Sequence, residues 1–385
     1  MSNIQDKSES IKQLAKNLPG QVVLVLQGGG ALGSYQAGVY QALHEAGIEP
    51  DWIIGTSIGA INASLIAGNE IEDRVARLRE FWKRMEQKPI WNFAEVLPGF
   101  DEKFSYWSTI THGIAGFFRP SPLAHAGDAF VLGPERAGYY TTAPLQRTLE
   151  ELVNFDLVSR CTPRLTVGAA HVRTSQMRYF DSRDGVVGLK HVMASGALPP
   201  AFPAVRIDGE LYWDGGILSN TPTEAVFDDD PRRDSLIFSV HLWNPAGSEP
   251  NTIAEVFNRH KDVQYSSRIA SQITRQQQTH KLRHIINQLA SRLPEVERNS
   301  AAVRELARFG CQTRMHVVRL LAPQLDRETH TKDIDFSPDG IRQRWDAGYA
   351  HTMDVLGRAP WLGDFDPLSA VILHDHMEYM PQAAE

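Results

Sequence analysis

The chain has 385 residues, enough to bury one large core or two smaller ones. With 42% apolar and 22% charged residues and no low-complexity tract, it has the composition of a globular protein, which excludes an intrinsically disordered chain. The net charge of −7 excludes the basic footprint of a protein that binds nucleic acid or anionic lipid.

The N-terminus and the cysteines indicate the compartment. Residues 1–20 are polar and of mixed charge, so we expect a loose N-terminal arm rather than a secretory signal. No run approaches the ~18 apolar residues that are needed to span a bilayer. Cys161 and Cys311 lie far apart without metal-site spacing, which favours a reducing compartment over a disulfide framework. Together these features predict a cytoplasmic protein.

Two strand–turn–helix units follow the arm. They comprise strand 22–26, glycine turn 28–33 and helix 35–46, then strand 52–54, glycine turn 55–59 and helix 58–67. The second helix is nearly all small or apolar, so we expect it to be buried against the sheet. Two such units in fewer than 50 residues predict a parallel α/β sheet.

Residues 81–140 hold 13 of the 34 aromatic residues of the chain, mixed with prolines and glycines. One interpretation is an inserted lid over an apolar substrate. The other is an irregular insertion whose rings pack on a small core of their own. The sequence favours neither.

The rest of the chain continues the sheet and then becomes helical. We predict strands at 165–169, 177–180, 210–213, 235–242 and 315–321, a helix at 190–196, helices from 252 to about 309 with a break at Pro294, and a helix from Ser337. We therefore expect an α/β domain over residues 21–245. Residues 246–385 should form a mostly helical C-terminal extension packed on the same domain.

The second glycine turn carries a candidate nucleophile. In Gly55-Thr56-Ser57-Ile58-Gly59 the serine lies where a strand turns sharply into a helix, and the flanking glycines remove Cβ clashes there. Ser57 would stand at the N-terminus of the helix, where the helix dipole favours developing negative charge. The pentapeptide alone is common, but its placement between a strand and a buried helix predicts a serine nucleophile.

The first glycine turn has two interpretations. Gly28-x-Gly30-x-x-Gly33 after a strand matches a dinucleotide fingerprint, but that fold needs an acidic residue at the end of the second strand. Here that strand runs into Gly55 and Ser57 instead. We therefore prefer an oxyanion hole formed by the backbone N–H groups of Gly28, Gly29 and Gly30.

A serine nucleophile needs a base. Among the fourteen histidines, the least implausible partner for a Ser-His-Asp triad is in His374-Asp375-His376. The alternative is Asp214 at the end of strand 210–213, since Gly215 and Gly216 would let another backbone approach its carboxylate. Most Asp-Gly pairs only open a turn, so the residues alone leave this choice open.

Three motifs taken together resemble the patatin-like phospholipases. They are the turn 28–33, the pentapeptide 55–59 and Asp214-Gly215-Gly216, and the connector 194–203 also resembles that family's segment before its aspartate. The resemblance covers about residues 20–245. The part beyond residue 250 resembles the C-terminal extension of a bacterial subgroup of the family.

The resemblance implies a three-layer α/β/α fold with a mainly parallel sheet. It also implies a serine acyl hydrolase with a Ser57–Asp214 dyad, acting on a lipid or other ester substrate, without a cofactor and with transient contact to a membrane surface. Gly33, Gly55, Gly59, Gly215 and Gly216 would support the motifs. The family often has arginine where this chain has Leu32, which weakens the inference of a phosphate-bearing substrate.

Two alternatives complete the predictions. His280 and His284 are four residues apart in a helical stretch, but their polar neighbours indicate a solvated face, so we expect no metal site. A catalytically inactive lipid-binding or scaffold protein on the same fold remains the alternative to an enzyme. The ester class, the acyl chain length and the oligomeric state are not readable from the sequence.

Overall fold

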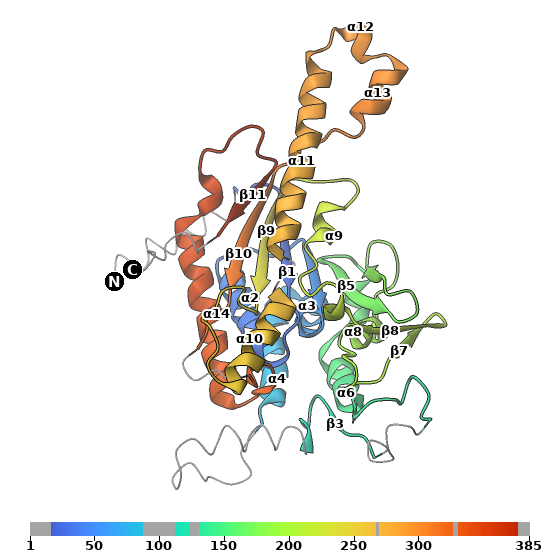
Figure 1. Ribbon diagram of the computed structural model, residues 1–385, viewed down its shortest axis with the longest axis vertical. Coiled ribbons are helices and arrows are strands. Elements are labelled where there is room, and N and C mark those ends of the chain that lie inside the picture. Colours follow the sequence, from blue (N-terminus) through green and yellow to red (C-terminus); the bar gives the residue numbers. More distant parts are fainter. Residues whose placement is uncertain (1–16, 88–111, 123–130, 267–268, 326–329, 376–385) are drawn as a thin grey trace.

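The structure is a computed structural model, and it describes residues 17–87, 112–122, 131–266, 269–325 and 330–375 (Figure 1). Its centre is a nine-stranded sheet. The strands are β1 (Gln21–Leu26), β2 (Trp52–Thr56), β5 (Arg164–His171), β6 (Met177–Asp181), β7 (Val205–Ile207), β8 (Glu210–Asp214), β9 (Ser235–His241), β10 (Met315–Leu321) and β11 (Val371–His374).

The sheet is mainly parallel, as predicted. Its order is β11-β10-β9-β1-β2-β5-β8-β7, with β6 paired to β5 outside this path. Every pairing from β11 through β5 is parallel, whereas β6, β7 and β8 pair antiparallel. Since β10 and β11 come from the C-terminal part of the chain, that part completes the same sheet.

The central strand β1 explains the layers. Val22, Leu24 and Leu26 face one buried cluster, while Val23 and Val25 face another on the opposite side. Alternate side chains of a strand point to opposite faces, so both faces must be covered. The continuous apolar run of β1 thus places the sheet between two helical layers, and the predicted α/β/α architecture is confirmed (Figure 1).

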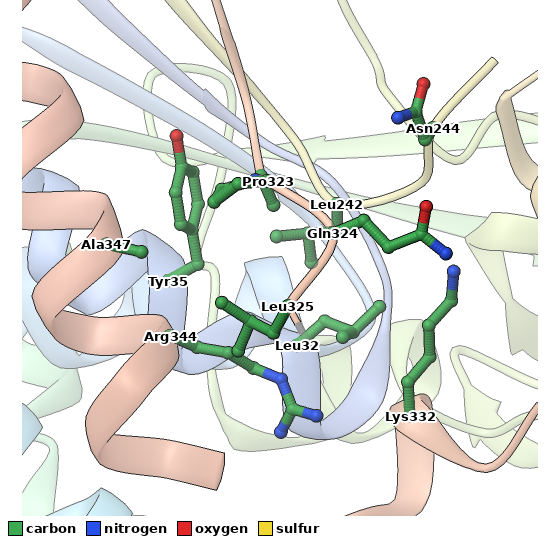
Figure 2. A pocket seen from close by; sticks show the side chains of 11 residues that line it. Leu32, Tyr35, Leu242, Asn244, Pro323, Gln324, Leu325, Lys332, Arg344 and Ala347 are labelled. Atoms are coloured by element: carbon green, nitrogen blue, oxygen red, sulfur yellow. The ribbon is translucent and has the colours of Figure 1, made fainter. Parts of the chain in front are cut away.

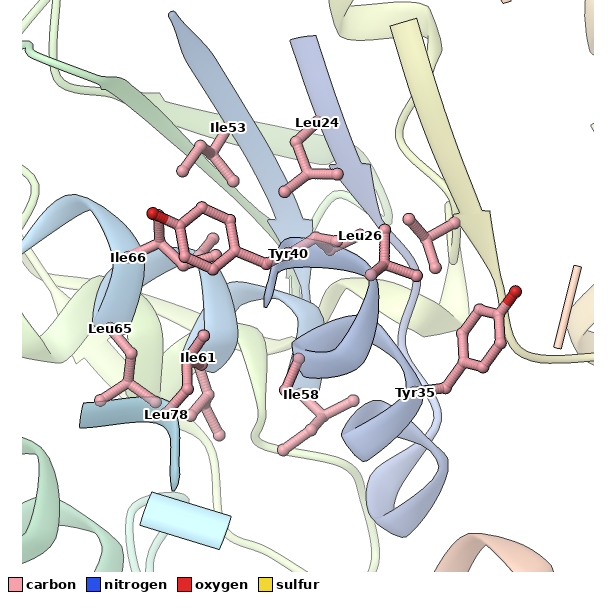
Figure 3. Packing of buried hydrophobic residues seen from close by; sticks show 14 of the residues in the cluster. Leu24, Leu26, Tyr35, Tyr40, Ile53, Ile58, Ile61, Leu65, Ile66 and Leu78 are labelled. Atoms are coloured by element: carbon pink, nitrogen blue, oxygen red, sulfur yellow. The ribbon is translucent and has the colours of Figure 1, made fainter. Parts of the chain in front are cut away.

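The helices that supply side chains to the first cluster include α2 (Ser34–Glu45), α3 (Ile58–Ala67), α4 (Arg74–Met85) and α14 (Pro338–Arg358). Figure 3 shows Leu24 and Leu26 of β1 facing Tyr40 of α2 and Ile58 and Ile61 of α3. The opposite cluster contains residues of α9 (Glu224–Phe227), and α11 (Ile269–Arg292) lies against α9 through a ring contact.

Helix α14 packs very closely on α2. A Cβ at Gly38 would overlap the carbonyl of Trp345, and a Cβ at Gly348 would overlap the carbonyl of Tyr35. The Trp345 Nε1 also donates to Gln41 Oε1 at 2.7 Å. Glycine on both helices is what allows this approach, so residues 338–358 share the core of the N-terminal units.

The other α-helices in the described part of the chain are α6 (Ala143–Leu152), α7 (Phe155–Val158), α8 (Leu189–Ser195), α10 (Ile253–Ser266), α12 (Glu295–Arg298) and α13 (Ala301–Ala307). The predicted break at Pro294 is confirmed, since α11 ends at Arg292 and Pro294 caps α12. Figure 1 shows α11 running along the sheet and past its end to α12 and α13. No helix in the described part of the chain is both long and apolar enough to cross a membrane.

Candidate active site

Ser57 lies at the turn between β2 and α3 and has a positive φ of 56°. This conformation is strained for a residue other than glycine, and such strain clusters at functional sites. A Cβ at Gly55 would overlap the carbonyl of Gly59, and a Cβ at Gly59 would overlap the carbonyl of Leu26. The two motif glycines therefore let α3 begin directly against the strands, which turns Ser57 out of the sheet.

The hydroxyl of Ser57 meets the carboxylate of Asp214. Ser57 Oγ donates to Asp214 Oδ2 at 2.6 Å, and the Gly216 N–H donates to Asp214 Oδ1 at 2.7 Å. Asp214 is 3% exposed at the end of β8, and burial raises its pKa to about 6 although both hydrogen bonds lower it. The two predicted residues, 157 positions apart, thus come together.

A second serine, Ser195, fixes the turn that carries Ser57. The backbone N–H of Ser57 donates to Ser195 Oγ at 2.9 Å, and Ser195 Oγ donates to the carbonyl of Gly168 at 2.6 Å. Ser195 is fully buried at the end of α8. Ser195 belongs to the connector 194–203, but no role could be predicted for it because only the fold brings α8 to the turn.

The first glycine turn lies beside Ser57: a Cβ at Gly28 would come within 3.0 Å of the Ser57 Cβ. Asn220, six residues after Asp214, clamps this turn, since its carbonyl accepts the Gly28 N–H at 3.1 Å and its Nδ2 donates to the Gly28 carbonyl at 3.1 Å. The Gly28 N–H is therefore occupied, which corrects its predicted role as an oxyanion donor.

The next two N–H groups differ from that of Gly28. Gly29 and Gly30 stand at the start of the 3-10 helix η1 (Gly30–Gly33), where N–H groups have no partner inside the helix. Within the described ranges, no residue accepts a hydrogen bond from either of them. The predicted donor set therefore narrows from three glycines to two.

A cavity of about 210 Å³ opens at these groups. Its charged lining residues are Asp214 and Asp333, with Ser57 and Asn220 beside them. The apolar lining consists of Ile58, Ile61, Phe117, Phe118, Tyr140, Leu198, Ala201, Phe202, Trp243, Tyr265, Ile334 and Phe336. Such a lining, with few polar groups at one end, suits an apolar ligand that is oriented by a polar head.

The predicted aromatic insertion lies partly outside the described residues. Residues 88–111 and 123–130 are not described, whereas Phe117, Phe118 and Tyr140 line the cavity. Phe118 packs against Phe202 at 5.5 Å between ring centroids, and Phe117 against Phe336 at 6.0 Å. Three rings of the insertion, Phe117, Phe118 and Tyr140, thus join the wall around Ser57.

Leu32 does not line this cavity. It is buried in a separate small space between η1 and the C-terminal residues, next to Leu325 and Arg344 (Figure 2). The side chain at this position therefore faces the C-terminal segment.

The histidine alternative does not meet Ser57. His374 on β11 stacks on His316 of β10, with 5.3 Å between ring centroids and a 3.0 Å hydrogen bond between the rings. Burial lowers the pKa of His374 to about 4. Asp375 pairs with Arg319 at 3.0 Å, and residue 376 lies outside the described residues.

The predicted solvated face of α11 is wrong. His280 is fully buried and packs on Phe227, with 5.8 Å between ring centroids, and the buried His284 bonds through Nε2 to the Thr313 carbonyl at 2.8 Å. With Ile273, they form a stripe at helical spacing, and that spacing is a signal for the buried side. Nowhere in the described ranges do three His, Cys, Asp or Glu residues form a group that would hold a metal.

Curated relatives match part of the chain. Lysophospholipase nte1 of Aspergillus terreus is 29% identical over 269 residues, which cover 63% of this chain and 15% of that protein. An uncharacterised NTE family protein of Mycobacterium bovis is 27% identical over 227 residues, covering 57% of this chain and 30% of that protein. The chain thus spans less than a third of the length of these relatives.

Solved structures are similar at low identity. VipD from Legionella pneumophila gives a TM-score of 0.38 at 17% identity over 94% of this chain and 73% of that chain. Human GIVD cytosolic phospholipase A2 gives 0.34 at 10% identity over 61% of this chain and 45% of that chain.

Two family models match successive parts of the sequence. The second, DUF3734, is described as Patatin phospholipase and matches residues 263–368. The first, described as Patatin-like phospholipase, matches residues 24–227, more than half of the chain, including the glycine turn, Ser57 and Asp214. The chain therefore belongs to the patatin-like phospholipase family.

Proposed function

We propose that this protein is a serine acyl hydrolase that cleaves carboxylic ester bonds of lipids. The observation that carries the proposal is the 2.6 Å hydrogen bond from Ser57 Oγ to Asp214 Oδ2 at the polar end of an apolar cavity. Membership of the patatin-like phospholipase family and the lysophospholipase name of the fungal relatives support a lipid ester as substrate.

In the proposed reaction, Ser57 Oγ attacks the ester carbonyl carbon while its proton passes to Asp214. The protonated Asp214 then gives this proton to the departing alkoxide oxygen as the carbon–oxygen bond of the ester breaks. Water attacks the acyl-serine next, loses its proton to Asp214, and releases the carboxylic acid as Ser57 regains its proton. A base with a pKa of about 6 is ionised at neutral pH and accepts a proton more readily than an ordinary aspartate.

The oxyanion of each tetrahedral intermediate would be held by the N–H groups of Gly29 and Gly30. Both belong to the start of η1, so the N-terminal end of a short helix adds a favourable partial charge. Asn220 and Ser195 would position the glycine turn and the nucleophile turn through the hydrogen bonds described above. A single N–H donor to the oxyanion, such as that of Gly29 or Gly30, typically lowers the barrier by about 3–4 kcal/mol.

We also propose which residues carry out the hydrolysis and which enclose the acyl chain. Residues 21–245 carry the hydrolytic groups, and Phe117, Phe118 and Tyr140 belong to the wall around the acyl chain. The cavity favours an apolar acyl group, because such a group would remove the apolar lining side chains from contact with water.

The test is hydrolysis of p-nitrophenyl esters from C2 to C16 by the wild type, Ser57→Ala and Asp214→Asn. We expect Ser57→Ala and Asp214→Asn each to lower kcat by about 10⁴ or more. Circular dichroism checks that the variants are folded. The chain length with the highest kcat/KM would define the acyl group.

Failure of the well-folded wild type to turn over any ester, together with no labelling by a fluorophosphonate, would favour an inactive lipid-binding protein. Full activity in either folded variant would contradict the dyad.

A further inference from the structure

A segment of the C-terminal part lies directly on the glycine turn 28–33. We call this turn the oxyanion turn, because its N–H groups would hold the oxyanion. We call residues 330–336, which contain the 3-10 helix η4 (Lys332–Ile334), the strap. A Cβ at Gly30 would overlap the carbonyl of Asp333, so the backbone of the strap occupies the position that a side chain at residue 30 would need. Asp333 also lines the catalytic cavity.

Two reciprocal ion pairs hold the strap on α10. Lys261 Nζ donates to both carboxylate oxygens of Asp333 at 2.7 and 3.0 Å, and Lys332 Nζ donates to Asp262 Oδ1 at 2.8 Å. A Lys-Asp dipeptide on the helix thus faces a Lys-Asp dipeptide on the strap. Both side chains of the second pair are more than nine-tenths buried, so removing one partner would leave an uncompensated charge.

The same cluster reaches the oxyanion turn by a second route. Lys332 Nζ lies 5.4 Å from the centre of the Trp243 ring, and Tyr265 of α10 packs on that ring at 4.9 Å. Trp243 Nε1 donates to the carbonyl of Gly28 at 2.8 Å. The strap and α10 therefore fix both the ring that holds Gly28 and the backbone that contacts Gly30.

The far end of the strap is anchored on α14. Arg344 donates through one guanidinium nitrogen to the Asp335 carbonyl at 2.9 Å and through the other to Asp335 Oδ2 at 3.2 Å. Lys332 and Arg344 appear together with Leu32 of η1 in Figure 2, where they line a small space that is separate from the catalytic cavity. Charged side chains of the C-terminal segment thus line the same space as Leu32 of η1, the helix that begins at the glycine turn.

We propose that Lys261, Asp262, Lys332 and Asp333 are positioning residues that hold Gly29 and Gly30 in the geometry needed to bind the oxyanion. The proposal rests on the proposed function, and it assigns the C-terminal segment a part in catalysis. The strap acts through backbone contact and through Trp243, and its ion pairs keep it in place. Loosening it lowers kcat, because a small misplacement of the donors weakens binding of the transition state more than binding of the ester.

The first experiment compares Lys261→Met with Lys261→Arg, which keeps the ion pair. Arg342→Met is the matched control, since Arg342 forms an exposed ion pair with Asp339 on α14. We expect Lys261→Met to lower kcat and the rate of fluorophosphonate labelling by about tenfold each, with KM changed by less than about twofold. Lys261→Arg and Arg342→Met should match the wild type.

Lys261→Met also leaves the Asp333 carboxylate unpaired near the oxyanion, so charge repulsion alone would slow the reaction. The double variant Lys261→Met/Asp333→Asn has no such repulsion, but it still lacks the ion pair between residues 261 and 333 that holds the strap on α10. We expect it to stay about tenfold slower than the wild type. Recovery to the wild-type rate in the folded double variant would overturn the positioning role.

Hydrogen exchange supplies a readout that does not depend on activity. We expect amides of residues 27–33 to exchange at least about threefold faster in the double variant, while those of residues 21–26 in β1 stay unchanged. Equal exchange of residues 27–33 in both proteins would overturn the proposal. If the wild type neither hydrolyses esters nor reacts with the fluorophosphonate, the proposed function fails, and the exchange comparison alone decides whether the strap holds the turn.

Discussion

The two sides of the catalytic cavity are built differently. On the nucleophile side, backbone contacts fix Ser57 and the glycine turn. Glycines let main-chain segments meet, and hydrogen bonds with Ser195 and Asn220 hold these segments in place. On the C-terminal side, side-chain charges fix the strap through two reciprocal Lys–Asp pairs.

This difference sets how each side responds to change. A close main-chain contact leaves no space for even one methyl group, so substitution there is costly and abrupt. The Lys261–Asp333 pair is partly exposed, at 30% and 21% of its side chains, so its contribution is graded and screened by salt. The strap combines both kinds of contact, because ion pairs hold it on α10 while its backbone touches Gly30.

Among the changes that probe the contact between the two sides, Gly30→Ala should have the largest effect, because Gly30 is where the strap touches the glycine turn. Gly30 has a φ of +56°, and a Cβ there would overlap the Asp333 carbonyl. We expect kcat to fall by about 10² or more, because the turn or the strap must move. Ester hydrolysis measures this loss.

Gly47→Ala is the matched control for that substitution. Gly47 also has a positive φ, +75°, but a Cβ there would meet no atom within 4 Å. It should therefore cost about 1–2 kcal/mol of stability through backbone strain alone and leave kcat unchanged. Equal losses of kcat in the two variants would remove the special role of the Gly30 contact.

The next effect concerns the stability of the nucleophile side. Burial raises the pKa of Asp214 from 3.8 to about 6, so the ionised carboxylate opposes folding above pH 6 and the penalty vanishes below pH 4. Asp214→Asn should therefore raise the free energy of unfolding by up to about 3 kcal/mol at pH 8 relative to its effect at pH 4. Urea unfolding at the two pH values measures this. A pH-independent difference between the two proteins would contradict a buried, ionised Asp214.

The smallest effect is the acid limb of activity. Asp214 must be ionised to accept the proton of Ser57, so kcat/KM should fall about tenfold per pH unit below a midpoint near pH 6. The pH profile of p-nitrophenyl ester hydrolysis gives the midpoint. A midpoint near 3.8 would mean that Asp214 is solvated in the free enzyme.

Helices and strands whose bounds depend on a local sequence pattern could be predicted from the sequence. Strand 315–321 and helix 58–67 have the predicted bounds, because an apolar run between glycines or caps is a local signal. The short edge strand β11 was missed, since its four residues carry little periodicity. The stripe of His280 and His284 was misassigned because neighbouring polar residues were weighed more than the spacing.

The candidate site was predicted only in part. Ser57 and Asp214 were paired through the family resemblance, since no local pattern links residues 157 positions apart. Gly28 was assigned as a donor because spacing cannot tell which N–H group is already bonded. The Lys–Asp dipeptides of α10 and the strap lie about 70 positions apart, and each alone resembles an ordinary surface pair.

The most direct test of the Ser57–Asp214 dyad is mass spectrometry of tryptic peptides after reaction with a fluorophosphonate at pH 8. We expect one label per chain on Ser57 in the wild type and none in Ser57→Ala. Asp214→Asn should label at least about 10² times more slowly, because Ser57 has then lost its base. A label on another residue, an unlabelled folded wild type, or an undiminished rate in Asp214→Asn would contradict the dyad.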